Sequence, residues 1–431
     1  MSSKGKSSAV VGEGAALVPK LRFPEFQELA DWETAAGNKL FQQVSNREAR
    51  PGLPILAITQ EHGAIPRHMI DYHVSVTEKS LKTYKEVMPG DFIISLRSFQ
   101  GGIEFSNYHG ICSPAYVILR KRGRLSDSFY RQYFKSPDFI QQLTRNLEGL
   151  RDGKMISYKQ FSGLQLLKPY LPEQQKIAVF LDSTDTLIVA QARKVEALKA
   201  HKKGLMQQLF PQDGETQPRL RFPEFKGAGE WFQTELGRLI EIKGRIGYRG
   251  YTVADIVDPG EGAIALSPSN ILENGSLGFE KTTFISWMKY NESPEIIVEK
   301  GQTLLVKTGS TYGKSAFVRE LFQQCTVNPQ IVVLKPISVD PFFLALLISG
   351  EGVQGKIEAN VVGGAIPTLS QGSISKFKVL VPEMSEQQRI ADCLSSLDDL
   401  LAAGIQKLET LKAHKKGLMQ QLFPRVAEVN A

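Results

Sequence analysis

The chain has 431 residues, 42% of them hydrophobic and 23% charged, with a mean hydropathy of −0.18. This length allows two or more domains, and no apolar run approaches the ~20 residues that a membrane helix needs. The formal charge of +7 favours a polyanionic partner but also fits a plain solubility role. The cysteines and histidines are scattered, without CxxC or HxxxH spacing, which argues against disulfides and against a zinc site.

The chain opens with residues rich in Ser, Gly, Ala and Lys, which lack the charged-then-apolar pattern of a secretory signal. We therefore expect residues 1–20 to be the flexible start of a cytoplasmic protein. The next phrase, LRFPEF from Leu21 to Phe26, occurs again from Leu220 to Phe225, so that the residue numbers differ by 220 − 21 = 199. Trp32 recurs as Trp231 with the same lag, so two stretches of the chain begin alike.

Two β-rich segments follow these openings, one from Trp32 to Tyr170 and one from Trp231 to Leu380. Short runs such as FIISL, YVILR, TLLVK and QIVVLKP are punctuated by Gly and Pro, a pattern typical of strands joined by turns. The two segments are weakly alike, which predicts one mixed fold used twice with different side chains. The matching residues are Gly90 to Ile94 with Gly301 to Leu305, and Ser113-Pro114 with Asn328-Pro329.

Loops of both segments carry side chains that suit DNA. Arg and Lys pair with guanine, Asn and Gln pair with adenine, and Gly lets the backbone approach a phosphate. For any single residue an ordinary surface role is the simpler interpretation, so only the whole set favours DNA contact. The candidates are Thr59, Gln60, Arg67, His68, Arg97, Ser98, Phe99 and Gln100 in the first segment, and Arg245, Tyr248, Arg249, Ser269, Asn270, Lys307, Thr308, Ser310, Tyr312 and Lys314 in the second.

Each β-rich segment leads into a long helix. Beyond Pro172 and Pro382, apolar residues recur every three, four or seven positions until a closing proline. The end of the first helix, LKAHKKGLMQQLFP from Leu198 to Pro211, returns letter for letter from Leu411 to Pro424, with an offset in residue number of 411 − 198 = 213. The predicted pairing stripe consists of Ile177, Leu181, Ile188, Val195, Leu198, Leu205 and Leu209, and of Ile390, Leu394, Leu397, Leu401, Leu408, Leu411, Leu418 and Leu422.

A helix of this length spans roughly 55 Å at ~1.5 Å per residue. Its narrow, nearly heptad stripe favours a coiled coil, and two almost identical helices in one chain make suitable antiparallel partners. The alternative is that each helix packs on its own β-rich domain, although two divergent domains would not require the same helix face twice. We predict an α+β fold with two similar β-rich mixed domains, each followed by a long helix, in a pseudo-twofold internal repeat.

Three short patterns resemble catalytic motifs without completing them. TGSTYGKS, from Thr308 to Ser315, lacks the first glycine of the phosphate loop GxxxxGK[ST]. Ser113-Pro114 and Asn328-Pro329 lack the second proline of an amino-methyltransferase signature. Pro137-Asp138 with Asp152-Gly153-Lys154 imitates a nuclease layout that arises easily by chance. Without a nucleophile–base pair or a metal cage, we expect no catalytic residues and no metal site in this chain.

The combination resembles the specificity subunit of Type I restriction–modification enzymes over nearly the whole chain. The resemblance rests on the two variable segments, each opening near Phe-Pro-Glu-Phe and Trp and closing with a Pro, then EQQ+IA and a long helix. The first closing has Pro172 directly before Glu173, whereas the second has Glu383 to Ser385 inserted between Pro382 and Glu386. This difference affects only the local geometry.

The resemblance implies a function as well as a fold. Each variable segment would be a target recognition domain that reads one half of a split site in double-stranded DNA. The paired helices would set the spacer and dock two methyltransferase subunits, which use S-adenosylmethionine to methylate adenine at N6. Motor–nuclease subunits using ATP and Mg would join them, whereas this chain would bind no cofactor and would not be an enzyme by itself.

The resulting organisation has seven parts. They are a flexible N-terminus at 1–20, target recognition domain 1 at 21–170, a central long helix at 171–211, a linker at 212–230, target recognition domain 2 at 231–382, a C-terminal long helix at 383–424 and a tail at 425–431. Two alternatives remain open: a coiled-coil scaffold or DNA-binding regulator outside restriction, and a fused methyltransferase or nuclease. The scaffold predicts little salt-dependent affinity for duplex DNA, and the fused enzyme predicts activity without partners.

Overall fold

The computed structural model describes residues 17–47, 52–70, 78–145, 156–212, 214–363 and 367–426, without the side chains of Glu78, Lys79 and Tyr248. Most of the expected flexible start and tail, and the nuclease-like Asp152-Gly153-Lys154, lie outside the described residues. The chain forms two compact units, unit 1 from Met1–Ala192 with Gln406–Ala431 and unit 2 from Arg193–Ile405. Both unit boundaries fall inside the long helices.

Unit 1 is built on a four-stranded antiparallel sheet whose strand order is β2-β9-β6-β7. Its strands are β2 (Phe41–Val44), β9 (Val117–Lys121), β6 (Phe92–Ile94) and β7 (Glu104–Phe105). Two further strand pairs are β3 (Leu56–Thr59) with β4 (Gly63–Pro66), and β5 (Lys85–Val87) with β8 (Gly110–Cys112). The short helices are α1 (Gly37–Leu40), α2 (Glu78–Leu81), α3 (Ser98–Gly101), α4 (Asp127–Tyr133), α5 (Pro137–Arg145) and α6 (Tyr158–Gly163). Aromatic rings, among them Phe41, Phe92 and Phe134, fill the core.

Unit 2 repeats this sheet in the order β12-β19-β16-β17. Its strands are β12 (Ile240–Gly244), β19 (Ile331–Pro336), β16 (Thr303–Val306) and β17 (Ser315–Phe317). A second four-stranded sheet contains β13 (Ile256–Val257), β15 (Phe284–Ser286), β14 (Gly262–Leu266) and β18 (Cys325–Val327). The short helices are α8 (Leu236–Leu239), α9 (Trp287–Asn291), α10 (Pro341–Ser349), α11 (Glu351–Asn360) and α12 (Gln371–Ser375).

The strand registers confirm the predicted internal repeat. Phe92 pairs with Leu119 in unit 1, and Thr303 pairs with Leu334 in unit 2. The offsets, 303 − 92 = 211 and 334 − 119 = 215, equal those from Gly90 to Gly301 and from Ser113 to Asn328. The weak sequence match therefore reflects one fold. The units differ in their second layer, where unit 2 has a four-stranded sheet and the described part of unit 1 has two separate pairs of strands.

Each β-rich domain is closed by a ribbon of its first and last strands. β1 (Glu33–Ala36) pairs antiparallel with β10 (Gln165–Lys168), and β11 (Phe232–Glu235) pairs in the same way with β20 (Lys378–Val381). The recurring tryptophans directly precede β1 and β11, and Trp32 and Trp231 are only 4% and 3% exposed. The repeated tryptophan thus belongs to the core beside the point where the chain enters and leaves each domain.

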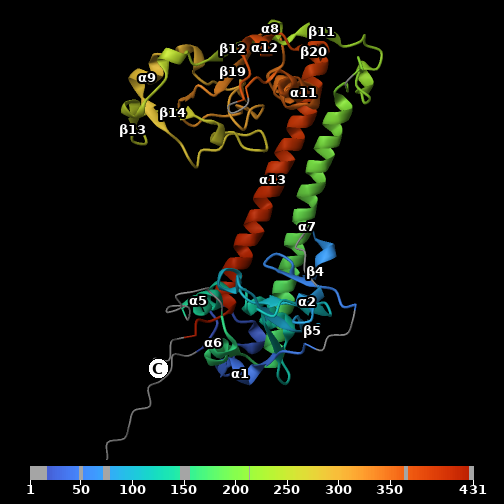
Figure 1. Cartoon of the computed structure of the whole chain (residues 1–431), viewed down its shortest axis with the longest axis vertical. Coiled ribbons are helices and arrows are strands. Elements are labelled where there is room, and N and C mark those ends of the chain that lie inside the picture. Colours follow the sequence, from blue (N-terminus) through green and yellow to red (C-terminus); the bar gives the residue numbers. More distant parts are fainter. Residues whose placement is uncertain are drawn as a thin grey trace, which may run out of the picture. The chain divides into compact units, whose positions relative to one another are not determined.

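The two predicted long helices are present, each 39 residues long: α7 (Leu171–Leu209) and α13 (Met384–Leu422). Figure 1 shows α7 in green and α13 in red. In unit 1 the Lys415 Nζ lies 2.6 Å from Asp185 Oδ1, and in unit 2 the Lys202 Nζ lies 2.5 Å from Asp398 Oδ1. Both pairs of residue numbers add up to 600, which confirms antiparallel pairing. The offset that relates the two helix sequences also relates the two ion pairs, since 398 − 185 and 415 − 202 both equal 213.

The helix ends also pack on the β-rich domains, so the two packing arrangements weighed from the sequence coexist. The core of unit 1 takes in Ile177 from the start of α7 and Leu422 from the end of α13. The core of unit 2 takes in Ile390 from the start of α13 and Leu209 from the end of α7. A stripe of apolar residues shows which helix face is covered but does not show whether a helix or a sheet covers it. The sequence alone therefore did not reveal that both arrangements are present.

All of the predicted stripe residues are at least half-buried. Those that are buried are Ile177, Leu181, Val195, Leu209, Ile390, Leu394, Leu418 and Leu422, and those of intermediate exposure are Ile188, Leu198, Leu205, Leu397, Leu401, Leu408 and Leu411. None of the helices in the described part of the chain combines the length and apolarity that a membrane crossing requires.

Candidate nucleic-acid interface

In both units, strand connectivity brings the candidate loops to one edge of the main sheet. The last residue of β6, Ile94, pairs with Val117, the first residue of β9, so the loops after β6 and before β9 lie at the same edge. In unit 2 the last residue of β16, Val306, pairs with Ile331, the first residue of β19. β12 also ends at this edge, where Gly244 pairs with Val332. We call this end of the strands, together with the loops that leave it, the loop edge of each domain.

The long helices attach at the opposite ends of the same strands. Ser126, in the connection that follows β9, donates its backbone N–H to Gln174 Oε1 of α7 at 3.0 Å. The backbone N–H of Asp340, which follows β19, donates to Gln387 Oε1 of α13 at 2.9 Å. Each loop edge is therefore the end of its sheet that lies away from the helix joined to it.

In unit 1, the β3–β4 turn joins the loop edge through one hydrogen bond. Gln60 Nε2 donates to the backbone oxygen of Arg97 at 3.2 Å. A Cβ at Gly101 would come within 2.5 Å of the Gln60 side chain, so the glycine allows this close approach. The side chains of Gln60, Arg97 and Gln100 are exposed or partly exposed, whereas Thr59 accepts the N–H of His62 and stabilises the turn itself.

Three other candidates of unit 1 have different surroundings. Ser98 is 1% exposed, and its Oγ accepts the backbone N–H of Ser95 at 2.8 Å. Phe99 is half-buried against the aromatic core. Arg67 and His68 follow β4, at the end of the β3–β4 hairpin opposite its turn, so the structure does not bring them to the Gln60–Arg97 contact.

In unit 2, the loop between β16 and β17 carries five of the candidates. The backbone of Lys307 is held on both sides, since its N–H donates to Gln330 O at 2.8 Å and its oxygen accepts the N–H of Leu369 at 2.7 Å. Ser310 is exposed, Thr308 and Tyr312 are half-buried, and Lys314 pairs with Glu273. TGSTYGKS thus joins two strands of one sheet and does not lead into the helix that a phosphate loop requires.

Arg245 and Asn270, two of the DNA-binding candidates, have buried side chains whose hydrogen bonds support the fold. Arg245 is 6% exposed and donates to Val327 O and to Thr326 Oγ1, both at 3.1 Å. Asn270 is 2% exposed; its Oδ1 accepts the backbone N–H of Ser267, and its Nδ2 donates to Gly278 O and Lys281 O. Like Ser98, these side chains are buried and hold loops through hydrogen bonds within the chain.

The remaining candidates of unit 2 are mixed. Arg249 is half-buried and donates to Glu292 O at 3.1 Å, and Ser269 is exposed beside the end of β14. The side chain of Tyr248 lies outside the described residues. Candidates chosen by residue type alone therefore include exposed groups at the loop edge, buried groups that hold loops, and others that lie elsewhere on the two domains.

Two ion pairs were not predicted from the sequence, although the motifs that contain their residues recur in it. Arg22, in the first LRFPEF, makes a two-pronged ion pair with Glu173, with distances of 2.9 and 3.0 Å. Arg221, in the second LRFPEF, binds Glu386 in the same way at 2.7 and 2.6 Å. The available signal was the recurrence of both partners, Arg22 with the lag of LRFPEF and Glu173 with the lag of the helix sequence. The LRFPEF and EQQ motifs therefore tie each domain opening to its helix.

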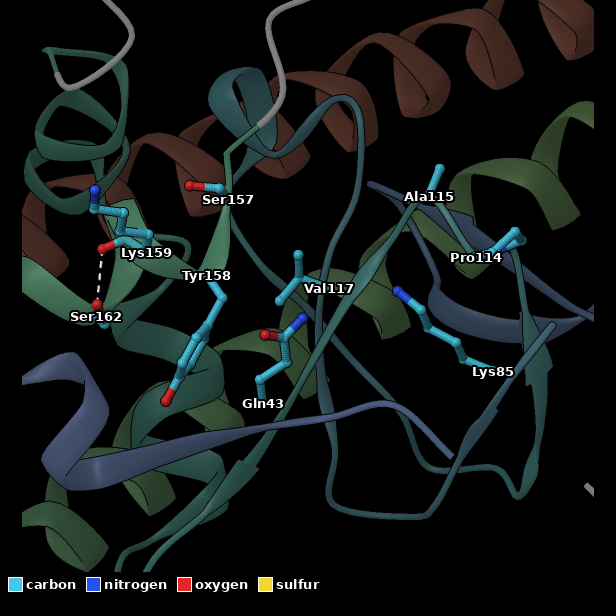
Figure 2. Close-up of a pocket in the computed structure, with 9 residues that line it drawn as sticks. All are labelled: Gln43, Lys85, Pro114, Ala115, Val117, Ser157, Tyr158, Lys159 and Ser162. Carbon is cyan, nitrogen blue, oxygen red and sulfur yellow. Dashed lines mark hydrogen bonds between the residues drawn. The ribbon is translucent and has the colours of Figure 1, made fainter. Parts of the chain in front are cut away.

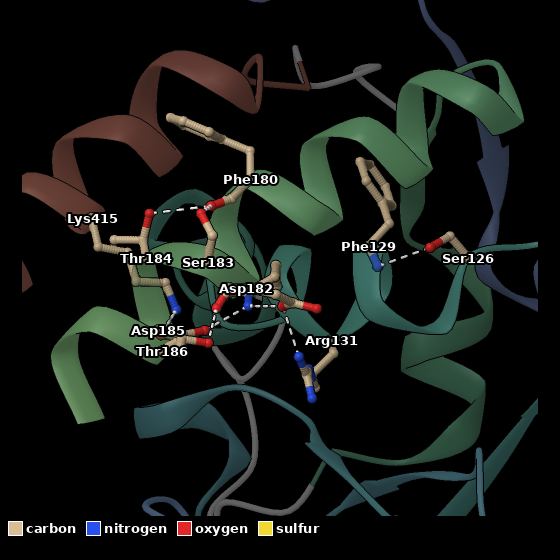
Figure 3. A network of polar contacts seen from close by, with 11 residues as sticks. Ser126, Phe129, Arg131, Phe180, Asp182, Ser183, Thr184, Asp185, Thr186 and Lys415 are labelled. Carbon is tan, nitrogen blue, oxygen red and sulfur yellow. Dashed lines mark hydrogen bonds and ion pairs between the residues drawn. The ribbon is translucent and has the colours of Figure 1, made fainter. Parts of the chain in front are cut away.

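A second polar network joins the domain of unit 1 to the paired helices (Figure 3). Asp182 accepts hydrogen bonds from Arg131 at 2.7 Å and from Gln132 at 2.8 Å, and Asp185 binds Lys415. In unit 2 the counterpart of Asp185 is Asp398, which accepts a hydrogen bond from Arg319 at 3.1 Å and pairs with Lys202. Equivalent aspartates thus anchor both a domain and the opposite helix.

Comparison with known proteins finds a family model and several proteins that are similar to this chain. Residues 264–413 match the family model described as the Type I restriction modification DNA specificity domain. The chain is 21% identical to the Type I restriction enzyme MjaVIII specificity subunit of Methanocaldococcus jannaschii over 94% of this chain and 93% of that protein. It is 27% identical to the HindI specificity subunit of Haemophilus influenzae over 29% of this chain and 28% of that one.

The family model therefore covers much of the second β-rich domain and much of α13, and the chain is similar to a Type I specificity subunit over nearly its whole length. A solved S subunit of a Type-I restriction-modification system from M. genitalium has the same fold as this chain, with a TM-score of 0.56 at 16% identity over 95% of this chain and 99% of that chain. A chain from a structure on complex assembly and conformational transition of the type I R-M system also matches with a TM-score of 0.56, at 14% identity over 92% of this chain and 98% of that chain. The family match begins within β14 and continues into α13, so it includes β16, β19 and the loop between β16 and β17 but not β12. Within the described ranges of the chain, no group of three or more His, Cys, Asp or Glu is placed to hold a metal ion.

Proposed function

We propose that the chain is the non-catalytic DNA-reading subunit of a Type I restriction–modification complex, in which each β-rich domain reads one half of a bipartite target. The observation that carries the proposal is the loop edge, which the same strand order forms twice and furnishes with different side chains. Each mismatched base pair costs about 1–3 kcal/mol, so two short half-sites together give strong discrimination.

The paired helices set the spacer between the half-sites in this proposal. A helix of 39 residues is about 58 Å long at ~1.5 Å per residue. Two domains held by such a pair engage one duplex together only when the half-sites have the matching separation. The duplicated ion pairs Asp185–Lys415 and Lys202–Asp398 support a fixed register between the helices.

The identical ends of the two helices support docking of two copies of one methyltransferase subunit. Lys199 and His201 are exposed, and so are their counterparts in α13, Lys412 and His414. Folding alone does not require identical residues at exposed positions, whereas two copies of the same partner do. S-adenosylmethionine, ATP and Mg act on the partner subunits in this proposal: the methyltransferases modify adenine at N6, and motor–nuclease subunits cut unmethylated DNA.

Replacing Arg97 by Ala tests the reading role of the loop edge. Arg97 is exposed there, and the hydrogen bond from Gln60 uses its backbone oxygen, which the substitution retains. We expect Arg97→Ala to weaken binding to a duplex carrying the methylated site about tenfold, the effect of ~1.4 kcal/mol. Fluorescence anisotropy at a fixed salt concentration measures this change.

Arg124→Ala is the matched control, because Arg124 is also exposed in the same domain but follows β9 at the helix-bearing end of the sheet. Its affinity for the duplex should remain that of the unchanged chain. Equal losses in the two variants would remove the loop edge from the proposal.

A further inference from the structure

An open depression lies at the loop edge of unit 1 (Figure 2). Its volume is about 660 Å³, and the loop before β9 contributes Pro114 and Ala115 to its wall. The other residues that line it are Gln43, Lys85, Val117, Ser157, Tyr158, Lys159 and Ser162. None of them belongs to the set of DNA-binding candidates that the sequence suggested.

Lys85 is the unusual group in this depression. It is 7% exposed, and its ammonium donates to the backbone oxygen of Tyr116 at 2.6 Å. Within the described parts of the chain it forms no ion pair, and burial lowers its pKa. A buried ammonium without an opposite charge is costly, because desolvation is not repaid by attraction.

The neighbouring acidic groups do not balance this charge. Glu86 binds Asn46 and His109, and Asp91 binds Arg120. Cys112 lies opposite Lys85 in the β5–β8 pair, but burial raises the pKa of its thiol to about 12, so the thiol stays neutral at physiological pH.

Other groups make the depression more positive and add a hydrogen-bond donor. Arg47 is close enough for its charge to lower the pKa of Lys85 further, and Lys159 adds a second ammonium to the lining. The side-chain amide of Gln43 has no hydrogen-bond partner among the described residues, and Figure 2 shows the Lys85 ammonium directed toward Val117 and Gln43. The Lys85 ammonium and the Gln43 amide therefore face the same open space, whereas the Lys159 ammonium is directed away from them.

The second copy of the fold shows that folding does not require a cation at this position. Glu86 pairs with Ile111 in unit 1 as Ile297 pairs with Thr326 in unit 2. The offsets, 297 − 86 = 211 and 326 − 111 = 215, are the same as in the main sheet. Lys85 therefore corresponds to Ile296, which is fully buried. An apolar residue fills this position in unit 2, so folding does not explain why unit 1 has an ammonium group there.

The buried cation of unit 2 provides a contrast. Arg245 lies against Thr326 and Val327, beside the strand that corresponds to β8. Burial lowers the pKa of Arg245, and the charges of Tyr251, Glu292, Glu295 and Asp255 act in the opposite direction. Arg245 thus has acidic side chains near it and donates three hydrogen bonds within unit 2, whereas Lys85 lines an open depression.

We propose that the depression is a phosphate-binding site of unit 1 in which Lys85 provides the central charge. A phosphate oxygen would supply the missing counter-charge, while Gln43 adds a donor at the rim. The site rests on the proposed function and deepens it, because the phosphodiester backbone of duplex DNA is the first source of such a group at the loop edge. A free phosphate-bearing ligand offers the same chemistry.

Lys85→Met tests the site in the full chain. Because Ile occupies the corresponding position in unit 2, we expect the variant to fold with an equal or higher Tm. We expect its affinity for duplex DNA at about 0.1 M salt to fall about tenfold for every sequence tried, and the slope of log K against log salt to decrease by about one. Lys39→Met, which removes an exposed lysine from α1, is the control and should change neither quantity.

A parallel titration with inorganic phosphate, at constant ionic strength and with Tm as readout, separates the two sources. Loss of DNA affinity and of one unit of salt slope in Lys85→Met assigns the site to the DNA backbone. Unchanged DNA binding with loss of a phosphate-dependent rise in Tm assigns it to a free phosphate ligand. If Lys85→Met alters neither, the site is overturned. If the unchanged chain binds no duplex, the proposed function fails, and the phosphate titration still decides the site.

Discussion

Shortening both long helices by seven residues in register is expected to reduce the spacer of the DNA target by about three base pairs. The block of α13 that matches residues 190–196 of α7 is 404–410, because the residue numbers of each ion pair add up to 600. Removing both blocks shortens the pair by ~10.5 Å at ~1.5 Å per residue, and duplex DNA rises ~3.4 Å per base pair. Single-molecule sequencing of N6-methyladenine in cells measures the new spacer directly.

Seven residues are nearly two helical turns, so each apolar stripe keeps its direction to within about 20°. The ion pairs Asp185–Lys415 and Lys202–Asp398 lie outside the removed blocks and re-form. Removing residues 190–196 alone shifts the two helices against each other and should abolish methylation. Methylation of the original site with its original spacer in the double deletion would contradict the spacer role of the helices.

Glu173→Ala is expected to destabilise unit 1 by roughly 3–5 kcal/mol, the cost of leaving one partner of a buried ion pair alone. The side chains of Arg22 and Glu173 are 7% and 1% exposed, and the bond to Glu173 is the main reason that the pKa of Arg22 is raised. Urea unfolding followed by Trp32 fluorescence, in a chain with Trp231 and Trp287 replaced by Phe, reports on unit 1.

The internal repeat supplies the controls for this experiment. Glu386→Ala should produce the same loss in unit 2, followed by Trp231 fluorescence in a chain with Trp32 and Trp287 replaced by Phe, because Arg221 and Glu386 form the equivalent pair. Replacing Arg22 and Glu173 together by Met should recover most of the stability of unit 1, since no unpaired charge remains. A loss below about 1 kcal/mol in Glu173→Ala would show that the ion pair does not hold the domain on its helix.

The repeat and the helices were predictable because they depend on patterns within short windows of sequence. Identical phrases at fixed lags predicted two copies of one fold, and apolar spacing predicted α7 and α13. The reason for the phrases was not predictable, because Arg22 meets Glu173 across 151 residues of chain. Covariation of that kind is invisible in a single sequence.

The loop edge was predictable in its residue types and not in its geometry. Arg97 and Lys307 come together with their loops only because β6 and β16 end where β9 and β19 begin. The role of Asn270 had a local signal, since Ser267 and Asn270 have the spacing of a capping box. The burial of Arg245 depends on contacts with Thr326 and Val327, which are 81 and 82 residues away in the chain, so the local sequence held no sign of it.

The most direct test of the reading role compares two cell lines by their N6-methyladenine patterns. One carries this gene and its methyltransferase, and the other lacks this gene alone. If this chain reads the DNA target, methylation disappears at one bipartite motif, whose two halves and spacer the unchanged cells reveal. An unchanged methylation pattern would contradict the claim that this chain reads the DNA target.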